Sequence, residues 1–227
     1  MPRASANPDR LYEIDEKFVW DYSRSFCRLV FLRREQGKLR TVAQRRLLVA
    51  EFNEAWAVPQ EFRKCDGSVA TLTVLMETHD DAGTKEKPFE GQFDCEKNIY
   101  LLANILGMFS SPQRARKIDE SVAAVILASV LSHEMQHFVD PAVGHRKLCY
   151  FSQPREIQAW ARGTLTLVEG YAKLGRIRKP QPAEFWLEEI LPYNTDFKMF
   201  MRGATRASSN KYMRYLWNAL MDRGWVE

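Results

Sequence analysis

The apolar run Val122 to Leu131 leads directly into the hexapeptide Ser132 to His137 (SHEMQH), and this combination constrains the fold more than any other segment. Five side chains of the segment recur at intervals of four, four, three and four residues: Val122, Ile126, Val130, His133 and His137. This is the period of an α-helix that buries one face. The sequence therefore predicts a buried helix whose last turns present two histidines along its buried stripe.

The two histidines have the spacing of a metal site. Residues four apart lie one above the other on a helix, so the imidazoles of His133 and His137 can reach one ion at the zinc–nitrogen distance of about 2.0–2.1 Å. Glu134 is turned about 100° aside, and its carboxylate can take a proton from the water that the metal activates. The pattern H-E-x-x-H is typical of zinc peptidases. The alternative is a core helix that carries these residues by coincidence.

A catalytic zinc ion needs a third protein ligand and one open position. The downstream candidates are Asp140, His145 and Glu156. The metzincin pattern H-E-x-x-H-x-x-G-x-x-H fails, because Asp140 stands at its glycine position and Val143 at its last histidine position. His145 lies eight residues past His137 in a loop with proline and glycine, and it can still curl back toward the metal.

Glu156 is the favoured third ligand. It lies nineteen residues past His137, in the first turn of the next predicted helix. An antiparallel helix pair would bring that turn beside the two histidines. The alternative is a glutamate that favours a helix N-terminus through the helix dipole. Two imidazoles and a carboxylate favour Zn²⁺, although cobalt, manganese or iron also accept these ligands.

With His133, His137 and Glu156 as ligands and Glu134 as base, the chain resembles the glutamate-zincins, the gluzincin group of metallopeptidases. The stretch from Tyr150 to Ala159 (YFSQPREIQA) is also similar to small zincin-like proteins of bacteria and bacteriophages. The resemblance implies a zincin-like fold and hydrolysis of peptide bonds.

The resemblance covers about residues 93–165 and is specific only at the metal-binding motif. Thermolysin-type enzymes place an aspartate four residues after the third ligand, where this chain has Trp160. The partner that orients the metal-bound histidines must therefore come from elsewhere, and Asp140 is a candidate.

Two further features of the site follow from the chemistry. A tetrahedral intermediate needs a hydrogen-bond donor for its oxygen, and Tyr150 or His145 can supply one from the loop. A tyrosine at the edge of the core is the alternative for Tyr150. Zincins hold an extended substrate along an edge strand, and the candidate for this strand is Lys97 to Leu102.

The first half of the chain is expected to form a small sheet with at least one helix packed on it. The pattern predicts strands at Phe26 to Leu32, Val69 to Met76 and Phe93 to Leu102. Thr41 to Trp56 has helical spacing, and His79 to Pro88 is polar and reads as a loop.

The second half is expected to be mostly helical. The first helix or helix pair starts at Ser111-Pro112 and runs to about Val139. Further helices are predicted at Pro154 to Leu174 with Gly175 as its stop, Pro182 to Leu191, Thr195 to Met201, and Ser209 to Asp222 ending at Gly224. Strands first and helices afterwards predict an α+β fold.

The predicted organisation is a flexible tail, residues 1–10, followed by one zincin-like domain, residues 11–227. Within this domain, residues 11–110 form the sheet-containing half and residues 111–227 the helical half with the metal site.

The amino-acid composition limits the kinds of partner and the location that we expect for the protein. The net charge of +4 is small and its basic residues are scattered, which disfavours nucleic acid. The richest apolar run is about half of what a bilayer needs, and no secretory signal is recognisable. The four cysteines form no CxxC pair. We therefore expect a cytoplasmic protein, although a protein packaged in a particle would share these features.

The predicted function is hydrolysis of a peptide or protein substrate, with Glu134 as general base. Two alternatives stay open. One is a zincin-fold regulator that processes or senses a single partner. The other is an interaction protein in which zinc only joins two helices. The sequence does not indicate whether the protein is a monomer or an oligomer.

Overall fold

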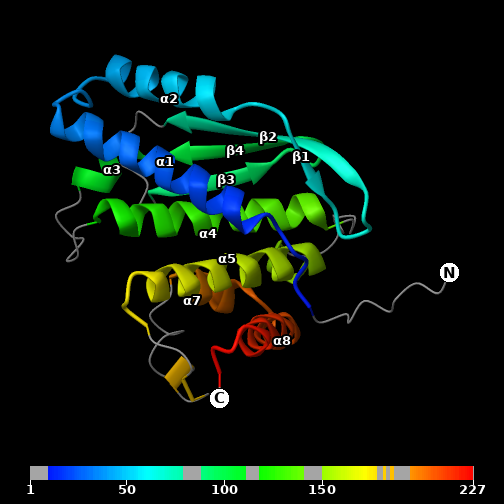
Figure 1. Cartoon of the computed structure of the whole chain (residues 1–227). Helices are drawn as coiled ribbons and strands as arrows, with labels where there is room; N and C mark the ends of the chain where they lie inside the picture. The colour runs from blue at the N-terminus through cyan, green and yellow to red at the C-terminus, as the bar shows by residue number, and fades with distance from the viewer. Residues whose placement is uncertain are drawn as a thin grey trace.

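The computed structural model describes residues 10–78, 88–110, 118–140, 150–177, 181–182, 185–186 and 195–226. These residues form a small four-stranded sheet and a larger number of helices (Figure 1), which confirms the predicted α+β class. The helices are α1 Glu16–Glu35, α2 Val42–Trp56, α3 Ile105–Ser110, α4 Glu120–Val139, α5 Pro154–Lys173, α7 Thr195–Gly203 and α8 Arg206–Asp222. The strands are β1 Gln60–Arg63, β2 Val69–Thr78, β3 Phe89–Phe93 and β4 Asn98–Ala103.

The sheet has the strand order β1-β2-β4-β3. β2 and β4 are parallel, whereas β1 and β3 are antiparallel to their neighbours. The prediction that Lys97 to Leu102 is the edge strand is wrong, because these residues fall on β4, which is hydrogen-bonded to a strand on each side. The edge strand that packs against α4 is β3.

The single strand predicted from Phe93 to Leu102 is also interrupted. The carboxylate of Asp94 accepts hydrogen bonds from the backbone N–H groups of Glu96, Lys97 and Asn98, which closes a tight turn between β3 and β4. Cys95 in this turn has a φ of 67°. An aspartate that binds its own backbone in this way is a turn signal, and it divides the apolar segment into a hairpin.

The strand predicted at Phe26 to Leu32 is wrong, because these residues lie inside α1. Asp15 begins this helix by accepting a hydrogen bond from the N–H of Phe18. The buried residues Phe18, Tyr22, Phe26 and Val30 then follow at intervals of four. A short apolar run taken alone does not distinguish a strand from part of a buried helix.

The other predicted elements agree with the structure where they are described. Thr41 begins α2 with a capping box, β2 contains the predicted strand, and α7 and α8 cover the last two predicted helices. α5 begins at Pro154, and Gly175 follows its end with a φ of 71°.

Some predictions fall where the structure is not described. α4 ends at Val139 as predicted and begins at Glu120, capped by Asp119, whereas the predicted start at Ser111-Pro112 lies outside the described residues. The same holds for the loop at residues 79–87 and for most of the helix predicted at Pro182 to Leu191.

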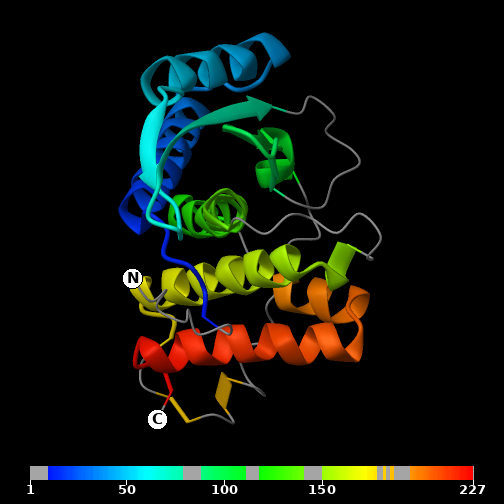
Figure 2. The ribbon, with the colours of Figure 1, turned by 90° about the vertical axis from the view of Figure 1, so that its right-hand side faces the viewer.

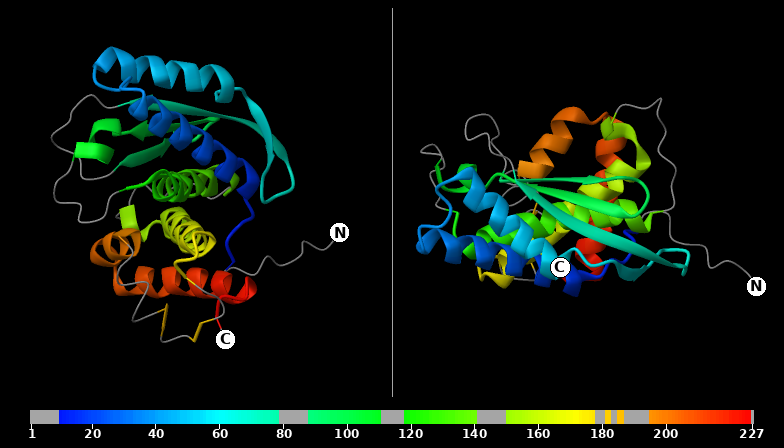
Figure 3. Two further views of the ribbon diagram at one scale, coloured as in Figure 1. Left: turned by 60° about the vertical axis from the view of Figure 1, so that its left-hand side comes forward. Right: turned by 90° about the horizontal axis from the view of Figure 1, so that it is seen from above.

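The elements pack in layers around α4. One hydrophobic core joins α1, α2 and the sheet to α4, and a second core lies among α5, α7 and α8. α4 and α5 lie side by side between these two cores (Figures 2 and 3). Their facing sides are therefore buried, and the side chains of His133 and His137 lie on the side of α4 that faces α5.

Small side chains let α4 and α5 approach closely. A methyl group on Gly163 of α5 would lie 3.1 Å from the carbonyl oxygen of Ser129 on α4. The Ser129 hydroxyl donates to the backbone carbonyl of Gly163, and the Thr166 hydroxyl donates to the hydroxyl oxygen of Ser132. Buried polar groups that are paired in this way fix how the two helices face one another.

Among the described helices, only α4 is long and apolar enough to cross a membrane by length and composition. The rest of the protein buries 89% of the most apolar 18-residue stretch of α4, as is usual for the core helix of a soluble protein. The composition of α4 is thus explained by its central place between the two cores.

Candidate metal centre

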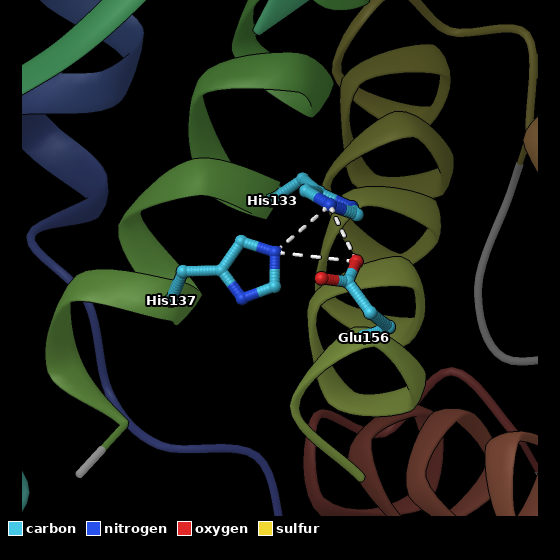
Figure 4. A group of neighbouring side chains, drawn as sticks. All are labelled: His133, His137 and Glu156. Atoms are coloured by element: carbon cyan, nitrogen blue, oxygen red, sulfur yellow. Dashed lines mark hydrogen bonds and ion pairs between the residues drawn. The ribbon is translucent and has the colours of Figure 1, made fainter. Parts of the chain in front are cut away.

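Three side chains from two helices converge at the C-terminal end of α4. His133 and His137 come from α4, and Glu156 comes from the first turn of α5 (Figure 4). The two Nε2 atoms are 3.2 Å apart, and Oε2 of Glu156 lies 3.4 Å from Nε2 of His137 and 3.7 Å from Nε2 of His133. The favoured three ligands of the sequence analysis are therefore brought together.

These distances fit one metal ion. An ion bonded tetrahedrally at about 2.0–2.1 Å separates its ligand atoms by about 3.3–3.4 Å. Oε2 of Glu156 is buried and has no hydrogen-bond partner. A buried carboxylate oxygen without a donor is costly, and a cation between it and the two imidazoles would satisfy it. The group can hold a metal ion.

The carboxylate of Glu156 is available as a ligand. Burial alone would raise its pKa, but the nearby imidazoles of His133 and His137 outweigh burial and hold the pKa well below its ordinary value. Glu156 is therefore ionised at neutral pH, the form that binds a metal.

Glu134 is buried beside the three ligands and faces the edge strand β3. Its carboxylate accepts a hydrogen bond from the backbone N–H of Phe93. Burial raises the pKa of Glu134; the imidazole of His133 opposes this rise, and the carboxylate of Glu156 adds to it. A glutamate with a raised pKa, held beside a metal site, has the properties of a general base.

Gly91 on β3 makes room for Glu134. A methyl group on Gly91 would lie 2.7 Å from Cγ of Glu134 and 2.9 Å from Cγ1 of Val130. Sequence reasoning missed Gly91 and Phe93. The available signal was a glycine inside a strand, which often marks a close approach of another group.

Tyr150 is close to the site, as expected from the sequence. It lies in the 3₁₀ turn Tyr150–Ser152 directly before α5 and is 47% exposed. Burial of its hydroxyl, together with the charge of Glu156, raises its pKa, so the phenol stays protonated and can donate a hydrogen bond. His145, the other candidate donor and alternative ligand, lies outside the described residues.

Asp140 does not join the three ligands. It is the C-cap residue of α4. Burial raises the pKa of Tyr12 and of Cys65, and the charge of Asp140 adds to the rise in both. The carboxylate therefore lies near these two side chains, and its expected role in orienting the histidines stays a prediction.

Two other residues touch the histidines. The indole of Trp160 packs edge-on against the ring of His133 at 5.0 Å. Nε of Arg155 donates a hydrogen bond to Nδ1 of His137 over 3.3 Å. Sequence reasoning missed Arg155, because nothing in its spacing indicates that it reaches back to α4.

A buried polar chain supports the helices behind the metal ligands. Nε of Arg162 donates to Gln136, Nε2 of Gln136 donates to Gln158, and Nε2 of Gln158 donates to the hydroxyl of Tyr215. This row of hydrogen bonds links α4 to α5 and α5 to α8 close to the metal ligands. It therefore holds the two ligand-bearing helices at a fixed distance.

Comparison of the chain with protein-family models, with curated proteins and with solved structures finds no match.

Proposed function

We propose that the protein is a zinc-dependent peptidase with a zincin-like fold. One observation carries the proposal. The buried carboxylate of Glu134 lies beside three converging ligand atoms and is held by the strand that borders the site. A metal site that only joins two helices has no use for a second buried acid, with a raised pKa, beside its ligands. Burial of such a group is costly unless it serves a function.

The number of ligands supports catalysis over a structural role. Among the described residues, the group comprises His133, His137 and Glu156, and no fourth ligand completes it. Catalytic zinc sites use three protein ligands and keep one position open, whereas structural sites are closed by four. Two imidazoles and a carboxylate suit zinc among the common metals.

The mechanism assigns a task to each group. A bound zinc ion would polarise the scissile carbonyl and lower the pKa of a water molecule toward neutrality. Glu134 accepts the proton of the attacking water and then delivers it to the leaving amine. The protonated hydroxyl of Tyr150 donates to the carbonyl oxygen as negative charge develops on it. His145 is the alternative donor for this last task.

The edge strand β3 suits a peptide substrate. An extended peptide can add to an open sheet edge by main-chain hydrogen bonds. β3 is such an edge, and it packs against the part of α4 that carries Glu134. A peptide paired with β3 would therefore lie beside the base and the metal ligands.

We propose the cytoplasm as the location of this activity. Cys27, Cys65 and Cys95 are free thiols in the described part of the chain, and free thiols persist in a reducing compartment.

Turnover of casein or of a quenched peptide library tests the proposal. The zinc-loaded protein should cleave several unrelated sequences, and phenanthroline should stop the reaction until zinc is restored. Stoichiometric zinc without turnover of any peptide would contradict the proposal and favour a structural ion. Cleavage confined to one partner protein would instead favour a regulator.

A further inference from the structure

Arg155 lies next to the metal ligands, and none of the described acidic residues pairs with it. Its terminal nitrogens lie 3.8 and 3.9 Å from Sγ of Cys95, and its Nε donates to Nδ1 of His137. Within the described part of the chain, no ion pair joins Arg155 to a carboxylate. Guanidinium carries five N–H donors, and here they meet one imidazole nitrogen and one thiol, which is a weak acceptor.

In the hydrogen bond between Arg155 and His137, the imidazole is the acceptor, whereas a metal-bound histidine must be the donor. A neutral imidazole that binds a metal through Nε2 keeps its proton on Nδ1, and that N–H needs an acceptor. Arg155 offers only donors. It is therefore not the group that orients His137 in the metal-bound protein, and metal binding would release its guanidinium from its best partner.

The position of Arg155 matches the proposed path of the substrate. Its side chain reaches from the first turn of α5 to Cys95, which lies two residues past the end of β3. Its charge also acts on Glu134. A peptide paired with β3 would thus pass the guanidinium at the Phe93 end of the strand, close to the reacting bond.

We propose that Arg155 binds a carboxylate of the substrate, so that the site selects peptides that carry an acidic group near the scissile bond. This inference rests on the proposed function, because it uses the same metal site and the same edge strand. A guanidinium and a carboxylate form two parallel, charge-assisted hydrogen bonds. The carboxylate replaces the thiol and imidazole contacts and comes from an acidic side chain or from the C-terminus of the peptide.

Equilibrium binding tests the inference without the need for catalysis. The zinc-loaded Glu134→Gln protein is titrated into four fluorescent peptides that combine a Glu or a Gln side chain with a free or an amidated C-terminus. The peptide with the preferred carboxylate should bind about tenfold more tightly than its neutral counterpart. Comparison of the Glu peptides with the Gln peptides tests the side-chain carboxylate. Comparison of the free with the amidated C-terminus tests the terminal carboxylate.

The variant Arg155→Gln, made in the same background, should lose this preference while it keeps one zinc per chain and the affinity for the neutral peptide. Arg63→Gln is the matched control, because it removes the same charge from the exposed edge strand β1, and it should keep the preference. Arg155→Lys should retain part of it, since lysine keeps the charge but not the paired hydrogen bonds.

Three results would overturn the inference: equal affinity for all four peptides, no binding of any of them, or loss of zinc in Arg155→Gln. The last would make Arg155 a positioning residue for His137. The proposed function fails separately. If wild-type protein hydrolyses no peptide but the charge preference is present, peptidase activity is excluded and carboxylate binding stands. If neutral and acidic peptides are hydrolysed and bound equally, only the carboxylate selection is wrong.

Discussion

Gly91 on β3 and Glu134 on α4 are packed so closely that a methyl group on Gly91 would lie 2.7 Å from Cγ of Glu134. The same strand donates the N–H of Phe93 to the carboxylate of Glu134. The edge strand therefore fixes the proposed base from two sides, once by a hydrogen bond and once by the absence of a side chain. The position of Glu134 depends on the sheet as much as on its own helix.

Gly91→Ala should displace Glu134 and leave the metal ligands in place. A displacement of about 1 Å at a catalytic group costs about a hundredfold in rate, so kcat for peptide hydrolysis should fall by that order while zinc content is unchanged. Steady-state kinetics and elemental analysis measure the two quantities. Gln92→Ala, at the exposed neighbouring position of β3, is the control. Equal activity of Gly91→Ala and wild type would show that Glu134 does not need this space.

Glu134→Gln should keep one zinc per chain and the thermal stability of the wild type, and it should lower kcat by at least about a hundredfold, as expected for loss of a general base. The amide keeps the shape of the side chain but cannot accept a proton from water. Joint loss of zinc and activity in this variant would point to Glu134 as a ligand instead.

Glu156→Ala should weaken zinc binding by more than the roughly 10- to 100-fold that loss of a residue outside the ligand set costs. Competition with a coloured chelator gives the affinity. His145→Ala should bind zinc like the wild type, and Glu61→Ala on β1 controls for the removal of a carboxylate. The opposite result, with zinc lost in His145→Ala and retained in Glu156→Ala, would identify His145 as the third ligand.

Acid should destabilise the protein through Glu16. Burial would raise the pKa of Glu16, but the hydrogen bond from Arg223 and the charges of Arg223, Arg162 and Lys173 outweigh burial and lower the pKa. A lowered pKa in the folded state gives stability that is present above the unfolded value and lost as pH falls through the folded one. The midpoint of thermal unfolding should therefore decrease below about pH 4.5.

Glu16→Gln should remove this contribution, which we estimate at about 1 kcal/mol because Glu16 is partly exposed and solvent screens its charge. Its unfolding midpoint should be lower at pH 7, and the difference from wild type should shrink on the acid side. Glu54→Gln at an exposed position of α2 is the control. A constant difference at every pH would show that packing rather than charge is responsible.

Local patterns were sufficient to predict the ligands. His133 and His137 are four residues apart on one helix, so their geometry follows from helix periodicity alone. Glu156 required only that the next helix return antiparallel, and the start of that helix at Pro154 is also a local signal. These features need no knowledge of how the sheet is arranged.

The surroundings of the site depend on tertiary structure and could not be predicted. Strand order determines that β3 rather than β4 is the edge, and no local pattern encodes it. The need for glycine at position 91 arises from a side chain 43 positions later in the chain. The apolar run Phe26 to Leu32 is strand-like when taken alone, and only the preceding Phe18 and Tyr22, at intervals of four, show that it continues a helix.

We expect His133, His137 and Glu156 to bind one zinc ion. Anomalous diffraction from zinc-supplemented crystals, measured on both sides of the zinc absorption edge, tests it directly. We expect a single strong peak at about 2.0–2.1 Å from Nε2 of both histidines, with a carboxylate oxygen of Glu156 as the third ligand. A folded protein without a peak at this site, or with the two imidazoles turned away from each other, would contradict it.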